Sequence, residues 1–555
     1  MFNFKILLRM KKIFFYALSL MCSISAQAAV ITYSYDGEKT EAENGTALQA
    51  AIAAAESGDE LKVQAGTYVG NFSMKEGVNV SGGWDANFET QTDYATILDA
   101  NASGRVVNQE AAFTTLTIWS NLTIQNGNLA EAGSQSLGSG VALKKKGQVK
   151  HCEIRNNTFS YQANCIGGGV GEDDTPDSNT EVMVDDCWIH HNCATHGGGV
   201  RIRGTIQNSI IENNNTKDVK AGPCGGVHLQ AGRMIGCVVR GNLSGGDTGG
   251  VRALGKCDVI NNLIHSNTAT GKVGGLSIES ALSNVIGNTI VKNNQIGNTG
   301  SQAGVRIDPS KTNNVFNLQP NGTFFVNNVV WGNMSNGVAE AQNVYYISRY
   351  DKSAGQRSYN AIIGQKGDDS AETSIQLTAD DPGFADAEHG DFSLLYTSAL
   401  LNFGNNDKAT VAKDLAGNNR IAGTTVDLGA YELPYITLTI AAFEHATLTA
   451  VGPGELVAGD YPLPMGYTTT ATIVAEEGYN IQSVTCGDAI LVADEGIYTL
   501  PALLTDMTLT ITVEKSTATG INDANTTTKT VKVIRNGQLF IIRDGKTFNV
   551  IGSQM

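Results

Sequence analysis

The stretch Gly197-Gly198-Gly199-Val200-Arg201-Ile202-Arg203 decides the fold of this chain, because both its glycine step and its alternation recur. Apolar residues alternate with arginines after the glycines, which is the period of a β-strand with one buried face. The step returns at intervals of 24 to 30 residues, at Gly140-Val141, Gly169-Val170, Gly226-Val227, Gly250-Val251, Gly275-Leu276 and Gly304-Val305. A repeat of this length predicts a solenoid, and the strand period predicts that its coils are β.

A second motif alternates with the first: an aliphatic residue followed three positions later by asparagine. Its copies are Ile154 with Asn157, Ile189 with Asn192, Ile211 with Asn214, Val239 with Asn242, Ile264 with Asn267, Val291 with Asn294 and Val330 with Asn333. Asparagine tolerates the left-handed backbone of a tight turn, and stacked asparagines can hydrogen-bond from one coil to the next. The two motifs together predict a stack of about twelve parallel coils.

The composition and the first residues predict an exported protein. The chain has 555 residues and a formal net charge of −16, which argues against nucleic acid and anionic membranes as its main partners. Three basic residues, an apolar run over 13–21 and Ala26-Gln27-Ala28 form a signal-peptide pattern, so residues 1–28 are predicted to be removed. No other stretch approaches the length of a membrane span. We therefore expect a secreted or cell-surface protein.

Eight cysteines follow the signal segment, and an exported protein permits disulfides. Three of them, Cys152, Cys187 and Cys237, precede the aliphatic residue of the second motif by two positions and are expected to be small buried residues. Three others fall just before a glycine step, at Cys165, Cys193 and Cys224, which makes a disulfide among them plausible.

The beginning of the mature chain carries a family resemblance. A helix is expected near Leu48 and Ile52, capped by Asn44 or Thr46, and Gly58-Asp59-Glu60-Leu61-Lys62-Val63-Gln64-Ala65-Gly66-Thr67-Tyr68 follows it. This combination resembles the opening of pectin-lyase-like right-handed parallel β-helix proteins, in which the helix plugs the open end of the stack. An uncapped coil would leave backbone groups unpaired.

A second resemblance predicts where the stack closes. The sequence runs through 380–384, 390–394 and 414–421 to Val426-Asp427-Leu428-Gly429-Ala430-Tyr431-Glu432. These segments resemble the choice-of-anchor domains of exported bacterial β-helix proteins, which implies display at a cell surface. We therefore expect a β-helix over residues 29–432.

The remaining chain is expected to contain three further parts. Residues 433–515 alternate threonine with apolar residues and resemble Ig-like modules of exported bacterial proteins, which predicts a small antiparallel β-sandwich. A polar linker is expected at 516–529. Residues 530–555 are hairpin-like and resemble the sorting tails of Bacteroidetes cell-surface proteins, without the usual proline-asparagine-proline core. The resemblance implies a C-terminal sorting or anchoring tail and allows attachment to the outer-membrane surface.

The glycine step also predicts a binding surface. The residues directly after each step point outward and stack in one column, which we expect to be an exposed basic stripe. Its candidate binding residues are Arg201, His228, Arg252 and Arg306. No cluster of a base with carboxylates accompanies them, so neither a catalytic residue nor a cofactor is predicted.

Two enzymatic alternatives stay open. A polysaccharide lyase would use one of these arginines as base, with Ca²⁺ held by Asp173, Asp174, Asp185 or Asp186. A glycoside hydrolase would use Glu279 and Asp308, which are expected to stack on neighbouring coils. His190, His191 and His196 are expected to be ordinary surface residues, and the aromatic candidates for stacking on sugars are Trp188, Trp331 and Tyr345.

The sequence therefore favours an adhesin-like or glycan-binding protein whose partner is a polysaccharide or a host or cell-surface glycan. The alternative is a lyase or hydrolase that acts on an acidic polysaccharide. Fold alone does not decide between them, because the β-helix supports both binding and catalysis.

Overall fold

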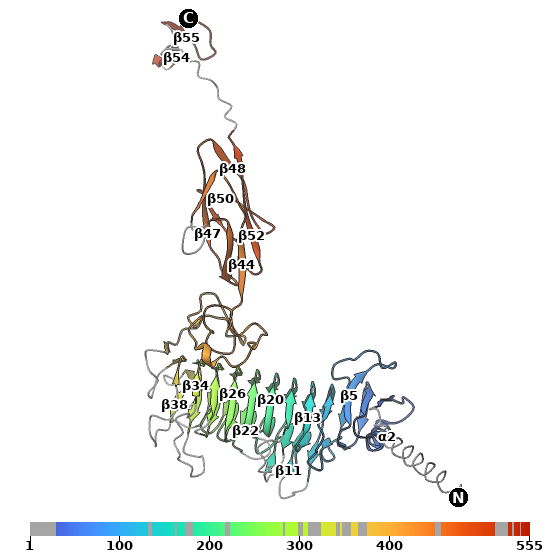
Figure 1. Ribbon diagram of the computed structural model, residues 1–555. Helices are drawn as coiled ribbons and strands as arrows, with labels where there is room; N and C mark the ends of the chain where they lie inside the picture. Colours follow the sequence, from blue (N-terminus) through green and yellow to red (C-terminus); the bar gives the residue numbers. More distant parts are fainter. Residues whose placement is uncertain are drawn as a thin grey trace, which may run out of the picture. The chain divides into compact units, whose positions relative to one another are not determined.

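The computed structural model describes residues 29–130, 136–160, 164–172, 181–216, 222–280, 283–297, 303–308, 324–339, 344–346, 357–363, 374–449, 457–516, 531–535, 538–543 and 545–555 (Figure 1). The chain divides into two compact units, Met1–Tyr435 with Pro464–Gly466, and Ile436–Leu463 with Tyr467–Met555. The predicted signal segment, nearly all of the predicted linker, and Asp173 and Asp174 lie outside the described residues.

The first unit is a right-handed parallel β-helix, as the repeats predict. Its largest sheet, here called sheet A, has twenty strands and contains the strands that follow the glycine steps. Sheet A comprises β1 (Val30–Tyr33), β2 (Glu60–Gln64), β4 (Phe72–Ser73), β5 (Asn79–Trp84), β7 (Val107–Asn108), β8 (Thr117–Ser120), β12 (Val141–Leu143), β13 (Gly147–Lys150), β17 (Val170–Glu172), β18 (Met183–Asp185), β20 (Val200–Gln207), β22 (Val227–Ile235), β25 (Val251–Ala253), β26 (Cys257–Ile260), β29 (Leu276–Ile278), β30 (Asn284–Ile286), β33 (Val305–Ile307), β34 (Phe324–Val326), β38 (Val344–Tyr346) and β39 (Arg357–Ser358).

A second sheet, here called sheet B, has one strand per coil and twelve strands in all, which matches the expected number of coils. It comprises β3 (Gly66–Val69), β6 (Thr96–Asp99), β9 (Leu122–Gln125), β14 (Glu153–Arg155), β19 (Trp188–His190), β21 (Ile210–Glu212), β23 (Val238–Arg240), β27 (Leu263–His265), β31 (Thr289–Val291), β35 (Val329–Trp331), β40 (Ala361–Ile363) and β41 (Ile375–Leu377). A smaller sheet joins β24 (Leu243–Ser244), β28 (Thr268–Ala269), β32 (Asn294–Gln295), β36 (Met334–Ser335) and β37 (Val338–Ala339).

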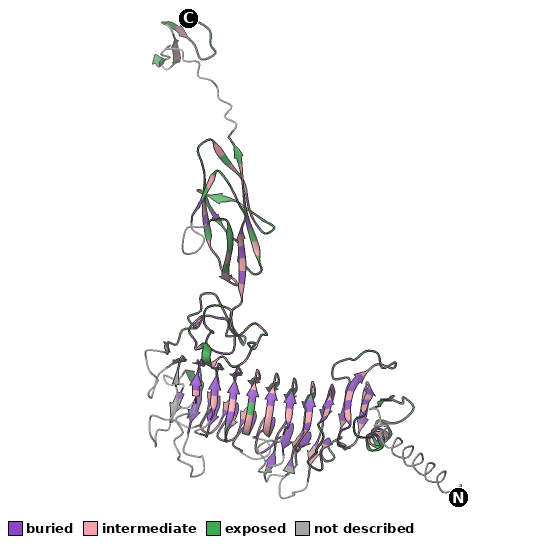
Figure 2. Ribbon diagram, viewed as in Figure 1, coloured by how far each residue is buried: buried purple, intermediate pink, exposed green. Residues whose placement is uncertain are grey.

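The interior of the stack is a continuous apolar core. Alternate residues of each strand point inward, so that Val251, Ala253, Val259 and Ile264 of one coil are fully buried (Figure 2). Equivalent residues pair in register from coil to coil, as Val239 does with Ile264. The strand alternation read from the sequence is therefore the alternation between core and outer surface.

The eight cysteines after the signal segment are all buried thiols. Cys152, Cys187 and Cys237 lie in the core, as predicted. The suggested disulfide among Cys165, Cys193 and Cys224 is wrong, because these thiols fill small spaces beside the turns: the first two pack with Phe159 and Ala194. Burial raises the pKa of Cys224 to about 12, so it stays a protonated thiol.

Stacked asparagines tie the coils together beside sheet B. Each Nδ2 of the predicted column donates to Oδ1 of the next asparagine, as from Asn242 to Asn267 and from Asn267 to Asn293, both at 2.9 Å. The residue in this column is Asn293 and not the predicted Asn294, which lies in β32. The ladder satisfies buried backbone groups at the turn, where a strand partner is missing.

A second ladder of asparagines lies on the other side of sheet B and was not predicted from the sequence. Asn262, Asn288, Asn328 and Asn360 are linked by the same contact, at 2.9 to 3.1 Å. In earlier coils the same column holds Cys152, Cys187, Ser209 and Cys237, each directly before its sheet B strand. The sequence does not reveal this column, because its residue type changes from cysteine and serine in the earlier coils to asparagine in the later ones.

The only α-helix of the described residues, α2 (Glu41–Ala54), lies at the first coils. Its N-cap is Thr40, which forms a capping box with Glu43, so the expected caps at Asn44 and Thr46 are wrong. Asn44 lies inside the helix and donates to the carbonyl of Asp36. Leu48 and Ile52 are buried in the core of the stack, which agrees with the predicted apolar face.

Residues 380–433, here called the closing segment, cover part of the outer face of sheet B. The segment contains β42 (Phe384–Asp386), β43 (Asp391–Leu394) and the 3₁₀ helix η2 (Asn406–Lys408). Its apolar residues pack against Leu263, Val291, Val329 and Trp331. Gly429 has φ +93°, and a Cβ there would lie 2.5 Å from Oγ1 of Thr289, so this docking requires glycine.

The second unit contains two small sheets and a separate C-terminal sheet. The first sheet joins β46 (Gly459–Pro464), β44 (Tyr435–Ile440), β52 (Met507–Lys515), β48 (Tyr479–Cys486) and β49 (Ala489–Leu491), and the second joins β45 (Ala446–Thr449), β47 (Thr470–Ala475), β51 (Ile497–Thr499) and β50 (Ala493–Asp494). The C-terminal sheet is antiparallel and joins β53 (Val531–Arg535), β54 (Gln538–Arg543) and β55 (Lys546–Phe548).

Candidate functional site

The predicted basic stripe forms a column but not an exposed surface. Arg201, His228 and Arg252 pair directly from coil to coil, and Ser277 and Arg306 continue the column. The side chains are nevertheless enclosed: Arg201 is 5% exposed, His228 2% and Arg306 6%. The expectation of an open basic surface on sheet A is therefore wrong.

The reason lies in the turns that precede each glycine step. Leu137 and Ile166, from the short strands that precede two of these steps, pack on Ala142, which belongs to the same column on an earlier coil. The ring of His196 stacks on that of His228, with 6.4 Å between the ring centroids. Burial and the neighbouring Arg252 and Arg201 lower the pKa of His228 well below its usual value, so its imidazole is neutral.

The proposed carboxylate pair of the hydrolase alternative lies on adjacent coils, as expected, but both groups bind arginine. Glu279 accepts two hydrogen bonds from Arg252, at 3.1 and 2.8 Å, and Asp308 accepts one from Arg306. Burial lowers the pKa of Arg252, but the contact with Glu279 outweighs it and the pKa is raised overall. These residues form a buried ion network in which Arg252 stays protonated and is a poor base.

Of the carboxylates suggested for Ca²⁺, the two among the described residues, Asp185 and Asp186, bind other side chains. Asp185 accepts from Gln207 and Asn208, and Asp186 binds Nδ1 of His151 at 2.7 Å. Among the described residues, no three His, Cys, Asp or Glu side chains converge in a way that would hold a metal ion.

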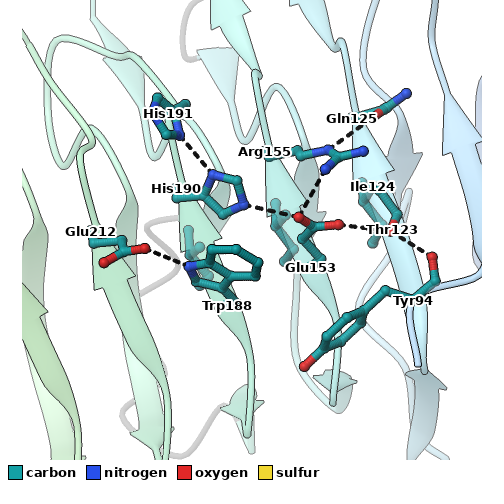
Figure 3. A network of polar contacts seen from close by, with 12 residues as sticks. Tyr94, Thr123, Ile124, Gln125, Glu153, Arg155, Trp188, His190, His191 and Glu212 are labelled. Carbon is teal, nitrogen blue, oxygen red and sulfur yellow. Dashed lines mark hydrogen bonds and ion pairs between the residues drawn. The ribbon is translucent and has the colours of Figure 1, made fainter.

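The outer face of sheet B carries a network of polar and aromatic side chains (Figure 3). We call this surface, over β9, β14, β19, β21 and β23, the open face. Its outward residues form two columns. The first column is Thr123, Glu153, Trp188, Ile210 and Val238, and the second is Gln125, Arg155, His190, Glu212 and Arg240.

Trp188 is the centre of the open face. Its side chain is 36% exposed, and the next residue of its column, Ile210, is 38% exposed. The indole Nε1 donates to Oε1 of Glu212 at 2.9 Å, and the ring lies 4.2 Å from the ring of His190, centroid to centroid. These contacts fix the orientation of the indole while one side stays open to solvent.

Glu153 and Glu212 each hold several neighbours in place. Glu153 accepts from Arg155 at 2.9 Å and from the Thr123 hydroxyl at 3.0 Å. Glu212 accepts from Arg240 at 2.5 Å. Burial raises the pKa of Glu212, but the hydrogen bonds from Arg240 and Trp188 outweigh it, so the pKa is lowered and the group is ionised.

His190 is placed as a neutral imidazole with a defined tautomer. Its Nε2 lies 3.1 Å from Oε1 of Glu153, and because a carboxylate oxygen accepts, Nε2 donates. Nδ1 then accepts from Nδ1 of His191 at 2.7 Å. Burial lowers the pKa of His190, and the contact with Glu153 opposes this only in part. His190 points outward but is buried by its neighbours, so the expectation that it is an ordinary surface residue is wrong, whereas His191 is exposed.

The open face ends where the closing segment begins. Val238 packs partly against the closing segment, and the ring of His265 on the next coil lies 5.2 Å from that of Phe392, centroid to centroid. Trp331 is only 7% exposed, because it lies beneath the same segment and donates to the carbonyl of Asp380. Of the aromatic candidates, Trp188 is thus accessible and Trp331 is not, while the side chain of Tyr345 lies outside the described residues.

The buried His265 predicts a loss of stability in acid. Burial, with Arg240 adding to it and Glu212 opposing it, lowers the pKa of His265 to about 4. In the unfolded chain, His265 binds a proton near pH 6.5, whereas in the folded chain it does so only near pH 4. The folded state is therefore not destabilised by this group above pH 6.5, and it loses stability as the pH falls from 6.5 towards 4. Between pH 7 and 5, His265→Met should lose about 2 kcal/mol less stability than the wild type.

Urea unfolding followed by tryptophan fluorescence measures this difference, because all four tryptophans belong to the first unit. His228 is also buried with a lowered pKa, but it is present in both the wild type and the variant, so its contribution to the acid loss is the same in both. Equal acid losses for the two proteins would contradict the assignment to His265.

Sequence reasoning missed the open face although the same rule would have found it. The residues on either side of each aliphatic residue of the second motif point outward, which selects Glu153 and Arg155 beside Ile154, and Trp188 and His190 beside Ile189. The repeated glycine step marks only the strands of sheet A. No repeated residue type marks the open face, so its columns do not stand out by eye.

Comparison with protein-family models and with curated proteins finds no match. Three solved structures have a similar fold at low identity. Pectate lyase Pel9A is 14% identical, with 73% of this chain and 97% of that chain covered and a TM-score of 0.39. The tailspike protein gp49 of Acinetobacter baumannii bacteriophage Fri1, a capsular polysaccharide depolymerase, is 12% identical, with 95% and 82% covered and a TM-score of 0.30.

The third is the PL6 family polysaccharide lyase Pedsa3628 from Pseudopedobacter saltans, 13% identical, with 72% of this chain and 99% of that chain covered and a TM-score of 0.28. Similarity at this level concerns the course of the chain and carries no statement about activity. In the described part of the chain, no helix has the length and apolar character of a membrane span.

Proposed function

We propose that this chain is an exported cell-surface protein that binds a glycan on the open face of sheet B. The observation that carries the proposal is Trp188, an indole fixed by Glu212 and His190 with one side left exposed. Such a ring offers an apolar platform for the C–H face of a sugar, and the polar groups around it match sugar hydroxyls. Export and surface display rest on the signal-peptide pattern and on the resemblance of the closing segment to anchor domains.

The arrangement of the open face suits a chain-like ligand. Trp188, Ile210 and Val238 follow one another on three successive coils, and His190, Glu212 and Arg240 run beside them. Successive coils are about 4.8 Å apart, so an extended glycan along the stack meets the same two kinds of contact on each coil.

Trp188→Ala should lower the affinity for such a glycan about 30-fold, because truncating an aromatic anchor at the centre of a site costs about 2 kcal/mol. Retention of the mature protein on a panel of immobilised glycans identifies a ligand, and titration calorimetry then compares the variants. Trp84→Ala is the matched control, since Trp84 is half-buried at the other side of the stack under the ammonium of Lys62. Equal losses in both variants would remove Trp188 from the site.

A second candidate function is polysaccharide cleavage at the same face, by a lyase or a hydrolase. It is favoured by the contact between Glu153 and His190, which leaves a neutral imidazole of fixed tautomer beside Trp188. Incubation with polygalacturonate, alginate and glycosaminoglycans, with and without Ca²⁺, tests for unsaturated products by ultraviolet absorbance. A reducing-sugar assay on the same samples tests for hydrolysis. Flat traces in both assays, together with retention on a glycan, would leave binding as the function.

A further inference from the structure

We infer that the glycan bound at the open face is uncharged. This inference rests on the proposed function and adds the substrate class. It departs from the acidic polysaccharide that the basic column on sheet A suggested, because that column is buried and the accessible site is a different one.

Both arginines of the open face are paired with a carboxylate. Arg155 donates to Glu153 at 2.9 Å and to Gln125 at 2.9 Å, and Arg240 donates to Glu212 at 2.5 Å. Each guanidinium is already neutralised by a carboxylate at hydrogen-bond distance, so neither offers an uncompensated positive charge to a uronate or sulfate. Glu153 and Glu212 are 6% and 8% exposed, so both carboxylates depend on these arginines to compensate their charge.

Carboxylates outnumber guanidinium groups on the open face and its edge. The open face and its edge at β6 carry the carboxylates of Asp99, Glu153 and Glu212 against two guanidinium groups. Asp99 accepts only from amides among the contacts of the described residues, namely Gln125, Asn126 and the backbone of Asn101. His190 adds no charge, because its pKa is lowered. An anionic sugar would therefore meet a local excess of negative charge on a chain whose net charge is already −16.

The groups that remain accessible to a ligand suit a sugar without charge. The indole of Trp188 and the side chain of Ile210 are apolar, and the partly exposed carboxylate of Asp99 offers acceptor oxygens to hydroxyl donors. Hydroxyl groups bind such acceptors without adding charge. The chemistry of the face is thus complementary to a neutral polyol ring.

The test compares polymers that differ only in charge. Polygalacturonate and its carboxyl-reduced form share one backbone, and galactomannan, xyloglucan and dextran extend the neutral set, with alginate and chondroitin sulfate extending the anionic set. We expect the full mature chain to be retarded in affinity electrophoresis by at least one neutral polymer and by no anionic one. The retardation should not change between low and high salt, and Trp188→Ala should abolish it.

A charge variant sharpens the test. Glu212→Gln keeps an acceptor for the indole but removes a negative charge and releases Arg240. The ratio of affinity for oligogalacturonate to affinity for the neutral ligand should rise about 5-fold at low salt. Glu181→Gln removes an exposed carboxylate that pairs with Lys146 away from the open face, and should leave the ratio unchanged.

The outcomes separate the two claims. Salt-sensitive binding of an anionic polymer that is lost in Trp188→Ala overturns the inference and leaves the proposed function standing. Binding of any polymer that Trp188→Ala does not affect overturns both, because the site then lies elsewhere. Absence of binding to every polymer also overturns both.

Discussion

Replacing Arg420 by methionine should lower the free energy of unfolding of the first unit by about 3–5 kcal/mol. Arg420 is buried in the closing segment, where its NH1 group binds Glu432 and its NH2 group donates to the carbonyls of Asp427 and Gly429. It is the cation beside three buried carboxylates, those of Asp414, Asp427 and Glu432. Removing it leaves the ionised groups among them without a counter-ion in a buried region.

The loss of stability caused by Arg420→Met depends on Glu432, because the pKa of this acid is already raised. Burial and the nearby Asp427 already raise it to about 8, and Arg420 holds it below the value it would otherwise reach. The double variant Arg420→Met with Glu432→Gln should therefore recover part of the loss, since a neutral amide replaces the most affected acid. A hydrophobic dye checks the mechanism, because a detached closing segment exposes Val291, Val329 and Trp331.

Urea unfolding by tryptophan fluorescence measures both variants. A loss below about 1 kcal/mol for Arg420→Met would mean that Arg420 is not the group that holds this network together.

Asn293→Ala should destabilise the first unit by about 3 kcal/mol or more, while the same change at the adjacent Asn294 should cost less than about 1 kcal/mol. The side chain of Asn293 donates to the carbonyls of Ile264 and Val291 and to Asn333, and accepts from the backbone and the side chain of Asn267. Alanine would leave these buried groups without partners. Asn294 lies half-buried in β32 and accepts one bond, from the backbone of Gly337.

This pair is a stringent comparison because residue type, coil and substitution are all the same. Similar losses at the two positions would show that the ladder adds little and that any asparagine at this turn suffices. Urea unfolding measured at one pH is enough for both.

The coil architecture could be predicted because it is repeated in the sequence. The step at Val200 and the motif at Ile211 mark the two faces of each coil, and their alternation follows the hydrogen-bonded register. Repetition fails where a position changes residue type, which is why the column of Cys237 and Asn262 was not recognised as one ladder.

The candidate site could be predicted only in part. Alternation correctly says that Arg201 and His228 leave the core, but it cannot say that Ile166 and His196 of the preceding turns lie over that column. What covers an outward side chain depends on contacts between distant segments, and no local period reports them. The same limit applied to Trp331, which the closing segment buries.

The central claim, that a glycan occupies the open face at Trp188, is tested most directly by chemical protection. Limited oxidation with N-bromosuccinimide attacks accessible indoles, and mass spectrometry assigns the modified residue. Trp188 is 36% exposed, whereas Trp119 is fully buried and Trp331 is 7% exposed. The account predicts that a retained glycan slows the oxidation of Trp188 and leaves that of Trp84 unchanged. Oxidation of Trp188 at the same rate with and without a bound glycan would contradict it.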